Sequence, residues 1–157
     1  MATYIFIKSK MTKMKRATIL KFENGYVIHS DSTTINGYGI ASEPYIIIDG
    51  SPSMERILNE ILYSLESSKI NVIDADSENS SKEYFKSIGI KRRKDLYKNS
   101  ICCSVFEKDN FIILLPTANM GPSEGFRPYL DGKVEIPINA SKEEKCNALV
   151  EALSRCE

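Results

Sequence analysis

Three neighbouring residues, His29, Ser30 and Asp31, carry the side-chain types of a hydrolase triad. In a working triad the histidine must lie within hydrogen-bonding reach of both partners, at about 3 Å. Consecutive residues of a strand point to opposite faces, so these three are not expected to converge. His29 is also the only histidine, which removes most other general-base schemes near neutral pH. We therefore predict no catalytic residues and no enzymatic activity; a hydrolytic enzyme stays as an alternative only if folding brings His29 or a carboxylate pair into a cleft.

Metal and cofactor motifs are incomplete in this sequence. Zinc sites use four ligands in characteristic pairs, such as two cysteines separated by two to four residues, whereas Cys102 and Cys103 are adjacent and the other two cysteines are distant. Gly37–Gly39 begins like a dinucleotide fingerprint without its third glycine, and Gly121–Gly125 lacks the lysine of a phosphate loop. We predict turns at both places, and no metal, cofactor or small-molecule substrate.

Acidic residues also have simpler explanations than catalysis. Glu143, Glu144 and Lys145 match the acid-x-lysine end of a nuclease motif. They fall in the predicted first turn of a helix, where acidic side chains complement the helix dipole. Asp74 and Asp76 lie in a polar, turn-rich segment and are expected to be solvated.

Charge is distributed unevenly along a chain of zero formal net charge. Six basic residues precede the first acidic one, Glu23: Lys8, Lys10, Lys13, Lys15, Arg16 and Lys21. The remainder therefore carries about −6, with a second basic run at Lys91–Lys94. The first basic segment, with Tyr4, Phe6 and Phe22 interleaved, is compatible with a nucleic-acid-binding module, which is our alternative function. The acidic remainder would repel phosphates over most of the surface, so nucleic acid is not the expected partner.

Length and composition predict a single domain over residues 1–157. A chain of this length with 42% hydrophobic residues buries a core without metal or disulfide staples. Tyr4–Ile7 is too short for a signal-peptide core, and no run approaches the roughly 18 apolar residues of a membrane span. We expect a cytoplasmic protein whose four cysteines are buried free thiols.

The first half of the sequence predicts antiparallel strands followed by a helix. The expected strands are Thr3–Ile7, Ala17–Phe22, Tyr26–Ser30 and the buried run Tyr45–Ile48. Asn24-Gly25 between two alternating segments is a strong hairpin signal. A helix is expected from Ser51 as N-cap and Pro52 at the first position. Its apolar stripe comprises Met54, Ile57, Leu58, Ile61, Leu62 and Leu65.

The second half predicts a short helix and a second hairpin. After the polar segment Asp74–Ser81, an amphipathic helix runs through Tyr84, Phe85 and Ile88 and ends at Gly89. The hairpin joins Ile101–Glu107 to Phe111–Leu115.

Three further segments complete the expected fold. Pro116–Lys133 is proline- and glycine-rich and is predicted to be a long irregular loop, and Val134–Ile138 a last short strand. Ser141 and Glu144 form a capping box for a final helix with Leu149, Val150 and Leu153 buried. The predicted class is α+β, a largely antiparallel sheet of about five or six strands packed with two main helices.

Several segments of the last third resemble one known family. They are Ile112–Thr117, Gly125-Phe126, Ile136-Pro137 and Asn139–Ser141 leading into Ala148–Cys156. This pattern is similar to the contact-dependent growth inhibition immunity proteins of bacteria, and the similarity extends to Asp49-Gly50 and the helix after it. The resemblance implies direct binding and neutralisation of a cognate toxin domain, often a nuclease, at the C-terminus of a large surface-exposed protein. The family has no contact motif that transfers to positions of this sequence.

The partner-binding residues are therefore inferred from residue chemistry. One candidate surface comprises Glu124, Phe126, Tyr129 and Asp131, because aromatic anchors with acidic neighbours suit a basic partner. The alternative for Phe126 and Tyr129 is that they hold down their own loop. A second candidate surface comprises Asp31, Tyr38 and Glu43 from another loop-like stretch. An exposed strand that accepts a partner strand is a third possibility.

Overall fold

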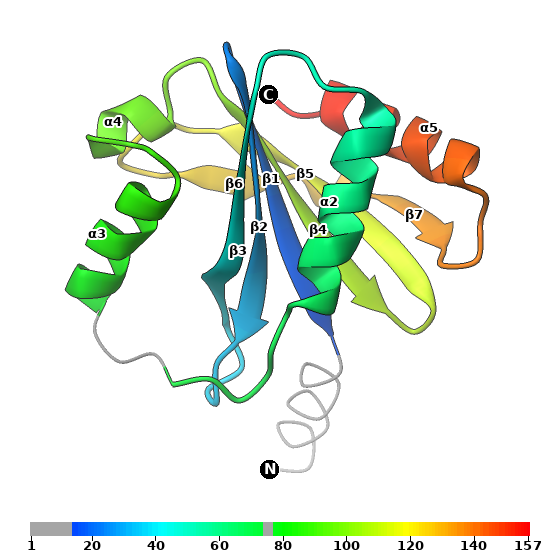
Figure 1. Ribbon diagram of the computed structural model, residues 1–157, viewed down its shortest axis with the longest axis horizontal. Coiled ribbons are helices and arrows are strands. Elements are labelled where there is room, and N and C mark those ends of the chain that lie inside the picture. Colours follow the sequence, from blue (N-terminus) through cyan, green and yellow to red (C-terminus); the bar gives the residue numbers. More distant parts are fainter. Residues whose placement is uncertain (1–13, 74–76) are drawn as a thin grey trace.

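The computed structural model describes residues 14–73 and 77–157, so the predicted strand Thr3–Ile7 and residues Asp74 and Asp76 lie outside the described part. The fold is α+β, as predicted, and its twisted antiparallel sheet is flanked by helices (Figure 1). The strands are β1 Lys15–Phe22, β2 Gly25–Thr33, β3 Gly39–Asp49, β4 Ile101–Lys108, β5 Phe111–Asn119, β6 Phe126–Pro128 and β7 Val134–Pro137. The helices are α2 Met54–Glu66, α3 Ser77–Ser87, α4 Arg93–Leu96, the 3-10 turn η1 Leu130–Gly132 and α5 Lys142–Ser154.

The sheet is built from two hairpins that meet at its centre. Its order is β3-β2-β1-β4-β5-β6, and β7 also pairs with β5. The two predicted hairpins, β1–β2 and β4–β5, are confirmed, and β1 joins them by pairing antiparallel with β4. Seven strands form among the described residues, where five or six were expected. This order leaves β3 at one edge of the sheet.

Helices α2 and α5 cover one face of the sheet and bury the main core (Figure 1). The predicted stripe of α2 supplies Ile57, Leu58, Ile61 and Leu65, each at most 5% exposed. The N-cap is Ser53, not Ser51, and its hydroxyl accepts from the Arg56 amide at 3.1 Å. Pro52 therefore lies before the helix, because the Ser53 side chain is the one placed to satisfy a free first-turn amide.

Helix α5 begins as predicted but turns a different face inward. The Ser141 hydroxyl accepts from the Glu144 amide at 3.1 Å, which confirms Ser141 as N-cap. The most buried side chains are Ala148, Leu149 and Ala152, whereas Val150 is 49% exposed. The prediction that Val150 is buried was wrong, because the small alanines four residues apart let this face approach the sheet closely.

Helices α3 and α4 cover part of the opposite face. Ile88 and Leu96 pack there against Leu20, Val27 and Cys102 in a second, smaller core. Helix α3 begins at Ser77, so the predicted polar segment Asp74–Ser81 is helical over its second half. Among residues 14–73 and 77–157, three helices are of substantial length, where two main ones were expected.

The predicted loop Pro116–Lys133 is largely ordered as a strand hairpin, so this prediction was wrong. Strand β5 continues to Asn119, and β6 pairs back onto it through Asn119↔Phe126 and Thr117↔Pro128. Gly121 and Gly125 form the turn between these strands, where the Gly125 amide donates to the Gly121 carbonyl at 2.7 Å, and Gly132 ends the 3-10 turn η1. Asn119 Nδ2 donates to the Tyr97 carbonyl at 2.8 Å and so fixes the end of β5.

The four cysteines are free thiols, as expected. Cys102 and Cys103 are buried, but the expectation that all four are buried was wrong, because Cys146 and Cys156 are only partly buried on and after α5. Cys156, which follows α5, interacts with Cys103 on β4, and hydrogen bonding between the two side chains lowers the pKa of Cys156 to about 7. The same pairing, together with burial, raises the pKa of Cys103.

We expect Cys156 to be the most reactive thiol of the native protein, because the thiolate is the nucleophile. Its alkylation by iodoacetamide, mapped by mass spectrometry, should rise steeply as pH increases through about 7. Cys146 is similarly accessible and serves as the internal comparison. Equal rates at Cys146 and Cys156 at pH 7 would contradict the assignment.

Candidate partner-binding surface

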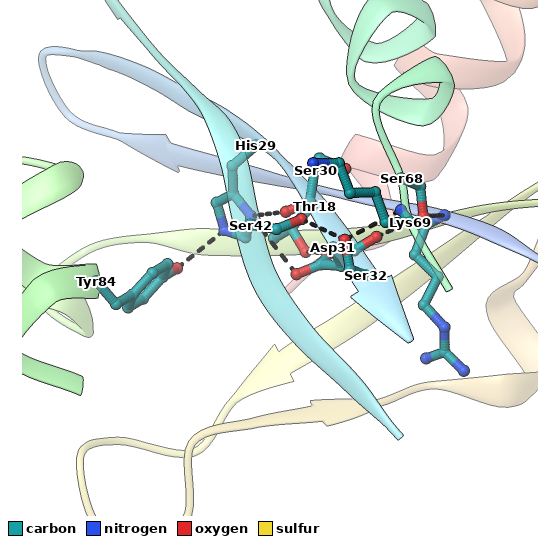
Figure 2. A network of polar contacts seen from close by, with 10 residues as sticks. Thr18, His29, Ser30, Asp31, Ser32, Ser42, Ser68, Lys69 and Tyr84 are labelled. Atoms are coloured by element: carbon teal, nitrogen blue, oxygen red, sulfur yellow. Dashed lines mark hydrogen bonds and ion pairs between the residues drawn. The ribbon is translucent and has the colours of Figure 1, made fainter. Parts of the chain in front are cut away.

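The triad-like residues of β2 do not assemble a triad. Instead, His29 connects helix α3 to the sheet. Its Nε2 lies 3.0 Å from the Tyr84 hydroxyl of α3, and its Nδ1 lies 2.9 Å from the Ser30 carbonyl oxygen (Figure 2). Asp31 shares the face of His29, with Oδ1 3.5 Å from Nδ1. The Ser30 hydroxyl is buried and has no hydrogen-bond partner among the described residues. His29 is 2% exposed, so this group joins α3 to the sheet rather than facing solvent.

Asp31 lies inside β2 and not on a loop, so its expected placement on a loop surface was wrong. Its side chain is 17% exposed and accepts a 2.5 Å hydrogen bond from the Thr18 hydroxyl. Desolvation raises the pKa of Asp31 above its usual value, and the nearby His29, Thr18 and Arg16 oppose this effect. A charged Asp31 therefore costs stability in the folded protein.

Replacing Asp31 with asparagine is expected to raise stability more at pH 7 than at pH 4. A carboxyl with a raised folded-state pKa stabilises the fold as pH falls and loses that contribution as pH rises through the folded value. Urea unfolding midpoints at the two pH values measure the difference between variant and wild type. Asp95→Asn is the control with the opposite sign, because Arg92 lowers the pKa of Asp95. A pH-independent difference for Asp31→Asn would contradict this explanation.

The edge strand β3 is interrupted in its middle. His29 pairs with Tyr45 and the next residue, Ser30, pairs with Ser42, so Glu43 and Pro44 bulge out of the ladder. A bulge bends its strand and ends regular pairing, and proline has no amide to donate. The edge is thus divided into two short stretches, a device that limits uncontrolled strand pairing.

An open groove of about 710 Å³ follows this bulge; we call it the edge groove. It lies between the bulge, the end of α2 with the segment after it, and the end of α3. Its lining residues are Glu43, Pro44, Tyr45, Tyr63, Glu66, Ser67, Ser68, Lys69 and Ser87. Tyr63 is 59% exposed. A half-exposed aromatic beside a charged rim is typical of a protein-binding site.

Hydrogen bonds hold the floor of the edge groove in place. The Ser68 hydroxyl donates to the Asp31 carbonyl at 2.6 Å and accepts from the Arg16 amide at 3.0 Å. The Lys69 amide donates to the Ser32 hydroxyl at 3.1 Å, and Ser32 bonds to Ser42 at 2.7 Å (Figure 2). The chain after α2 is thereby fixed to three strands, so the groove is preformed.

A smaller hollow of about 220 Å³ shares Glu43, Ser67 and Lys69 with the edge groove. Beyond it, the segment after α2 pairs with the end of β2 through the parallel bridge Thr34↔Val72. Large apolar side chains are exposed at this end of the molecule: Ile35 (46%), Tyr38 (47%), Ile70 (45%) and Ile73 (77%). Exposed apolar residues beside a polar groove are a common feature of interaction surfaces.

The other predicted surface lies across the sheet, around β6 and η1. Phe126 packs against Tyr97 with ring centroids 4.9 Å apart, so it holds down its own hairpin. Tyr129 lies against Gly132 and is 50% exposed. Glu124 forms an exposed ion pair with Arg127 at 3.6 Å, and Asp131 is exposed on η1. These four residues are therefore separated from Tyr38 and Glu43 by the width of the sheet.

Tyr63 was missed by the sequence analysis, although a signal was present. It lies two positions after Ile61 and so falls outside the apolar stripe of α2. An aromatic residue on the polar face of an amphipathic helix has no core to pack into. Lys69 and Ser68 carried no such signal, because their importance depends on contacts with distant strands.

The described residues thus form an α+β fold with a preformed groove at a sheet edge, and comparison with known proteins identifies the family of the chain. The sequence model described as CDI immunity protein matches residues 15–156, and the chain belongs to this family. The expected resemblance to contact-dependent growth inhibition immunity proteins is confirmed. No protein with a curated description matches it in sequence.

Two solved structures share the fold over nearly their whole length. A protein of unknown function, NMB0488 from Neisseria meningitidis, is 21% identical with a TM-score of 0.79, over 93% of this chain and 97% of that chain. A CdiA-CT/CdiI toxin and immunity complex from Yersinia pseudotuberculosis contains a chain that is 16% identical with a TM-score of 0.76, over 92% of this chain and 98% of that one. No helix in the described part of this chain is long and apolar enough to cross a membrane.

Proposed function

We propose that this protein neutralises the C-terminal toxin domain of a large surface-exposed protein by binding it directly in the cytoplasm, without catalysing a reaction. The observation that carries the proposal is the edge groove. It is open, hydrogen bonds fix its floor, and exposed apolar residues lie next to it. A preformed surface of this kind loses little conformational entropy when a partner binds. The Yersinia neighbour is described as a toxin and immunity complex, which supports a toxin as the partner.

The toxin domain is proposed to contact the edge groove through Glu43 and Tyr63. Glu43 lines both hollows and forms no ion pair within residues 14–73 and 77–157, so its charge is available to a basic partner group. Tyr38 extends the same surface at its far end, and Asp31 supports it from below. Glu124, Phe126, Tyr129 and Asp131 remain a second candidate surface at the other side of the sheet.

A nuclease is the proposed activity of the toxin. Nuclease active faces bind phosphates and are therefore basic. Residues 23–157 carry a net charge of about −6, and opposite net charges accelerate association. The negative net charge of residues 23–157 supports this part of the proposal. The proposed nuclease activity belongs to the toxin and not to the immunity protein.

Co-expression tests the proposed function. The toxin domain encoded beside this protein is expressed in a sensitive strain with and without it, and the pair is then purified through a tag on the toxin. Growth rescue with a stable complex is the expected result, and addition of the immunity protein should stop nucleic-acid degradation by the purified toxin. Growth arrest despite good expression, with no complex, would overturn the assignment for this pair. If the protein rescues growth without forming a complex with the toxin, and the purified protein binds RNA, the nucleic-acid alternative is favoured.

A further inference from the structure

A second groove lies on the outer side of α3, and its walls are basic. It has a volume of about 480 Å³ and is lined by Lys82, Phe85, Lys86, Gly89, Ile90 and Lys91. Lys82 and Lys86 are one helical turn apart and so project from the same side of α3. Phe85 and Ile90 are partly buried, pack against the smaller core and give this lysine groove an apolar floor.

The lysines of this groove are available to a partner, whereas the neighbouring arginines are not. Within the described residues, Lys82, Lys86 and Lys91 form no ion pair. Arg92 is held by both carboxylate oxygens of Asp95 at 3.2 Å. Arg93 donates to the Pro122 carbonyl at 3.0 Å, and its guanidinium lies 5.7 Å from the ring centre of Tyr97.

Because the lysines are unpaired and the arginines are paired, the groove favours carboxylates over a nucleic acid as the ligand. Nucleic-acid sites combine arginine forks for phosphates with open aromatic faces for bases. Here the guanidinium groups of Arg92 and Arg93 already have partners. The Phe85 ring is partly buried and packs against Tyr84, with ring centroids 5.9 Å apart. Unpaired lysines around an apolar floor match a polypeptide segment that carries acidic side chains around one apolar anchor.

The lysine groove adjoins the edge groove. Ser87 lines the edge groove and its neighbour Lys86 lines the lysine groove. The exposed side chain of Ile47 on the edge strand β3 lies beside Gly89 of the lysine groove. A standard interface buries about 800 Å² on each partner, so a domain seated on the edge groove reaches across the end of α3.

We propose that the toxin domain occupies both grooves and places an acidic segment with an apolar anchor in the lysine groove. This inference rests on the proposed function. The two contacts have opposite charge character, with Glu43 on one side of α3 and three lysines on the other. Such an arrangement fixes the orientation of a partner and disfavours partners with a different charge pattern.

The test is a double charge reversal, Lys82→Glu with Lys86→Glu, in the full chain. The matched control is Lys21→Glu with Lys108→Glu, which changes net charge equally on β1 and β4, away from α3. Toxin binding is measured by surface plasmon resonance at two salt concentrations, and circular dichroism checks the fold. We expect Kd to rise at least tenfold more in the α3 variant than in the control.

The outcomes separate the inference from the proposed function. If wild type fails to bind the toxin domain, the proposed function is wrong. If wild type binds and the α3 variant matches the control, the lysine groove is not part of the interface and the inference is overturned. Wild-type binding of a fluorescein-labelled oligouridylate that disappears in the α3 variant would likewise overturn it, in favour of nucleic acid.

Discussion

Replacing Tyr63 with alanine is expected to weaken toxin binding by a factor of about 30 or more, because truncation of a central aromatic anchor typically costs 2 kcal/mol or more. Tyr63 lines the edge groove and is 59% exposed, so its side chain contributes little to the core of the free protein. The unfolding midpoint should therefore stay close to that of wild type. Isothermal titration calorimetry with the purified toxin domain measures the affinity, and protection in the co-expression strain should fall with it.

Tyr129→Ala provides the matched control for this prediction. Tyr129 is also half exposed, at 50%, but lies across the sheet on the other candidate surface. If the toxin uses the edge groove, Tyr129→Ala leaves the affinity within about threefold of wild type, as expected for a residue outside the interface. A large loss from Tyr129→Ala with none from Tyr63→Ala would move the interface to β6 and η1 and reject the edge groove.

Replacing Gly25 with alanine is expected to lower the free energy of unfolding by about 3 kcal/mol or more. A Cβ atom at this position would lie 2.2 Å from the Ile48 carbonyl oxygen and 3.1 Å from the Asp49 Cα. Both are backbone atoms of the neighbouring strand, so relief requires β2 and β3 to separate where Gly25 pairs with Asp49. For a chain of this size the melting temperature should fall by about 10 °C.

Gly50→Ala distinguishes this clash from a general intolerance of glycine replacement. Gly50 has a φ of +81° and open space around it, so alanine meets no atom within 4 Å. Only the left-handed backbone is then unfavourable, at roughly 1–2 kcal/mol. Thermal unfolding of the two variants should rank Gly25→Ala as clearly the less stable. Equal losses of stability would show that the steric clash with β3 is not the main cause of the Gly25→Ala effect.

Local signals predicted the elements of this fold where they act within a few residues. The Asn24-Gly25 turn located the first hairpin, and the three-and-four spacing of Ile57, Leu58 and Ile61 located α2. The loop expected over Pro116–Lys133 shows the limit of such signals. Its prolines and glycines indicate turns, but the strand character of Thr117–Asn119 depends on pairing with β6 and on the bond from Asn119 to Tyr97.

The candidate site could be predicted only in part for the same reason. Glu43 and Tyr38 were named from residue type alone, and Glu43 does line the groove. Its juxtaposition with Tyr63 follows from β3 being a sheet edge, which depends on β1 pairing with β4. No local pattern in the sequence specifies that pairing. Asp31 was named for its charge, yet the alternation of β2 places it inward beside His29.

The position of β1 in the sheet has a consequence for synthesis of the protein on the ribosome. Lys15–Lys21 pair with Glu107–Ile101, so one side of β1 has no partner until residues about 85 positions later have left the exit tunnel. In the nascent chain, the first hairpin therefore has an unpaired edge at β1 until β4 is synthesised. Pairings between distant segments form late and slowly, and an unpaired strand favours aggregation meanwhile. We expect the yield of soluble protein to depend on the rate of translation between Asp49 and Ile101 and on chaperones that bind β1 during this interval.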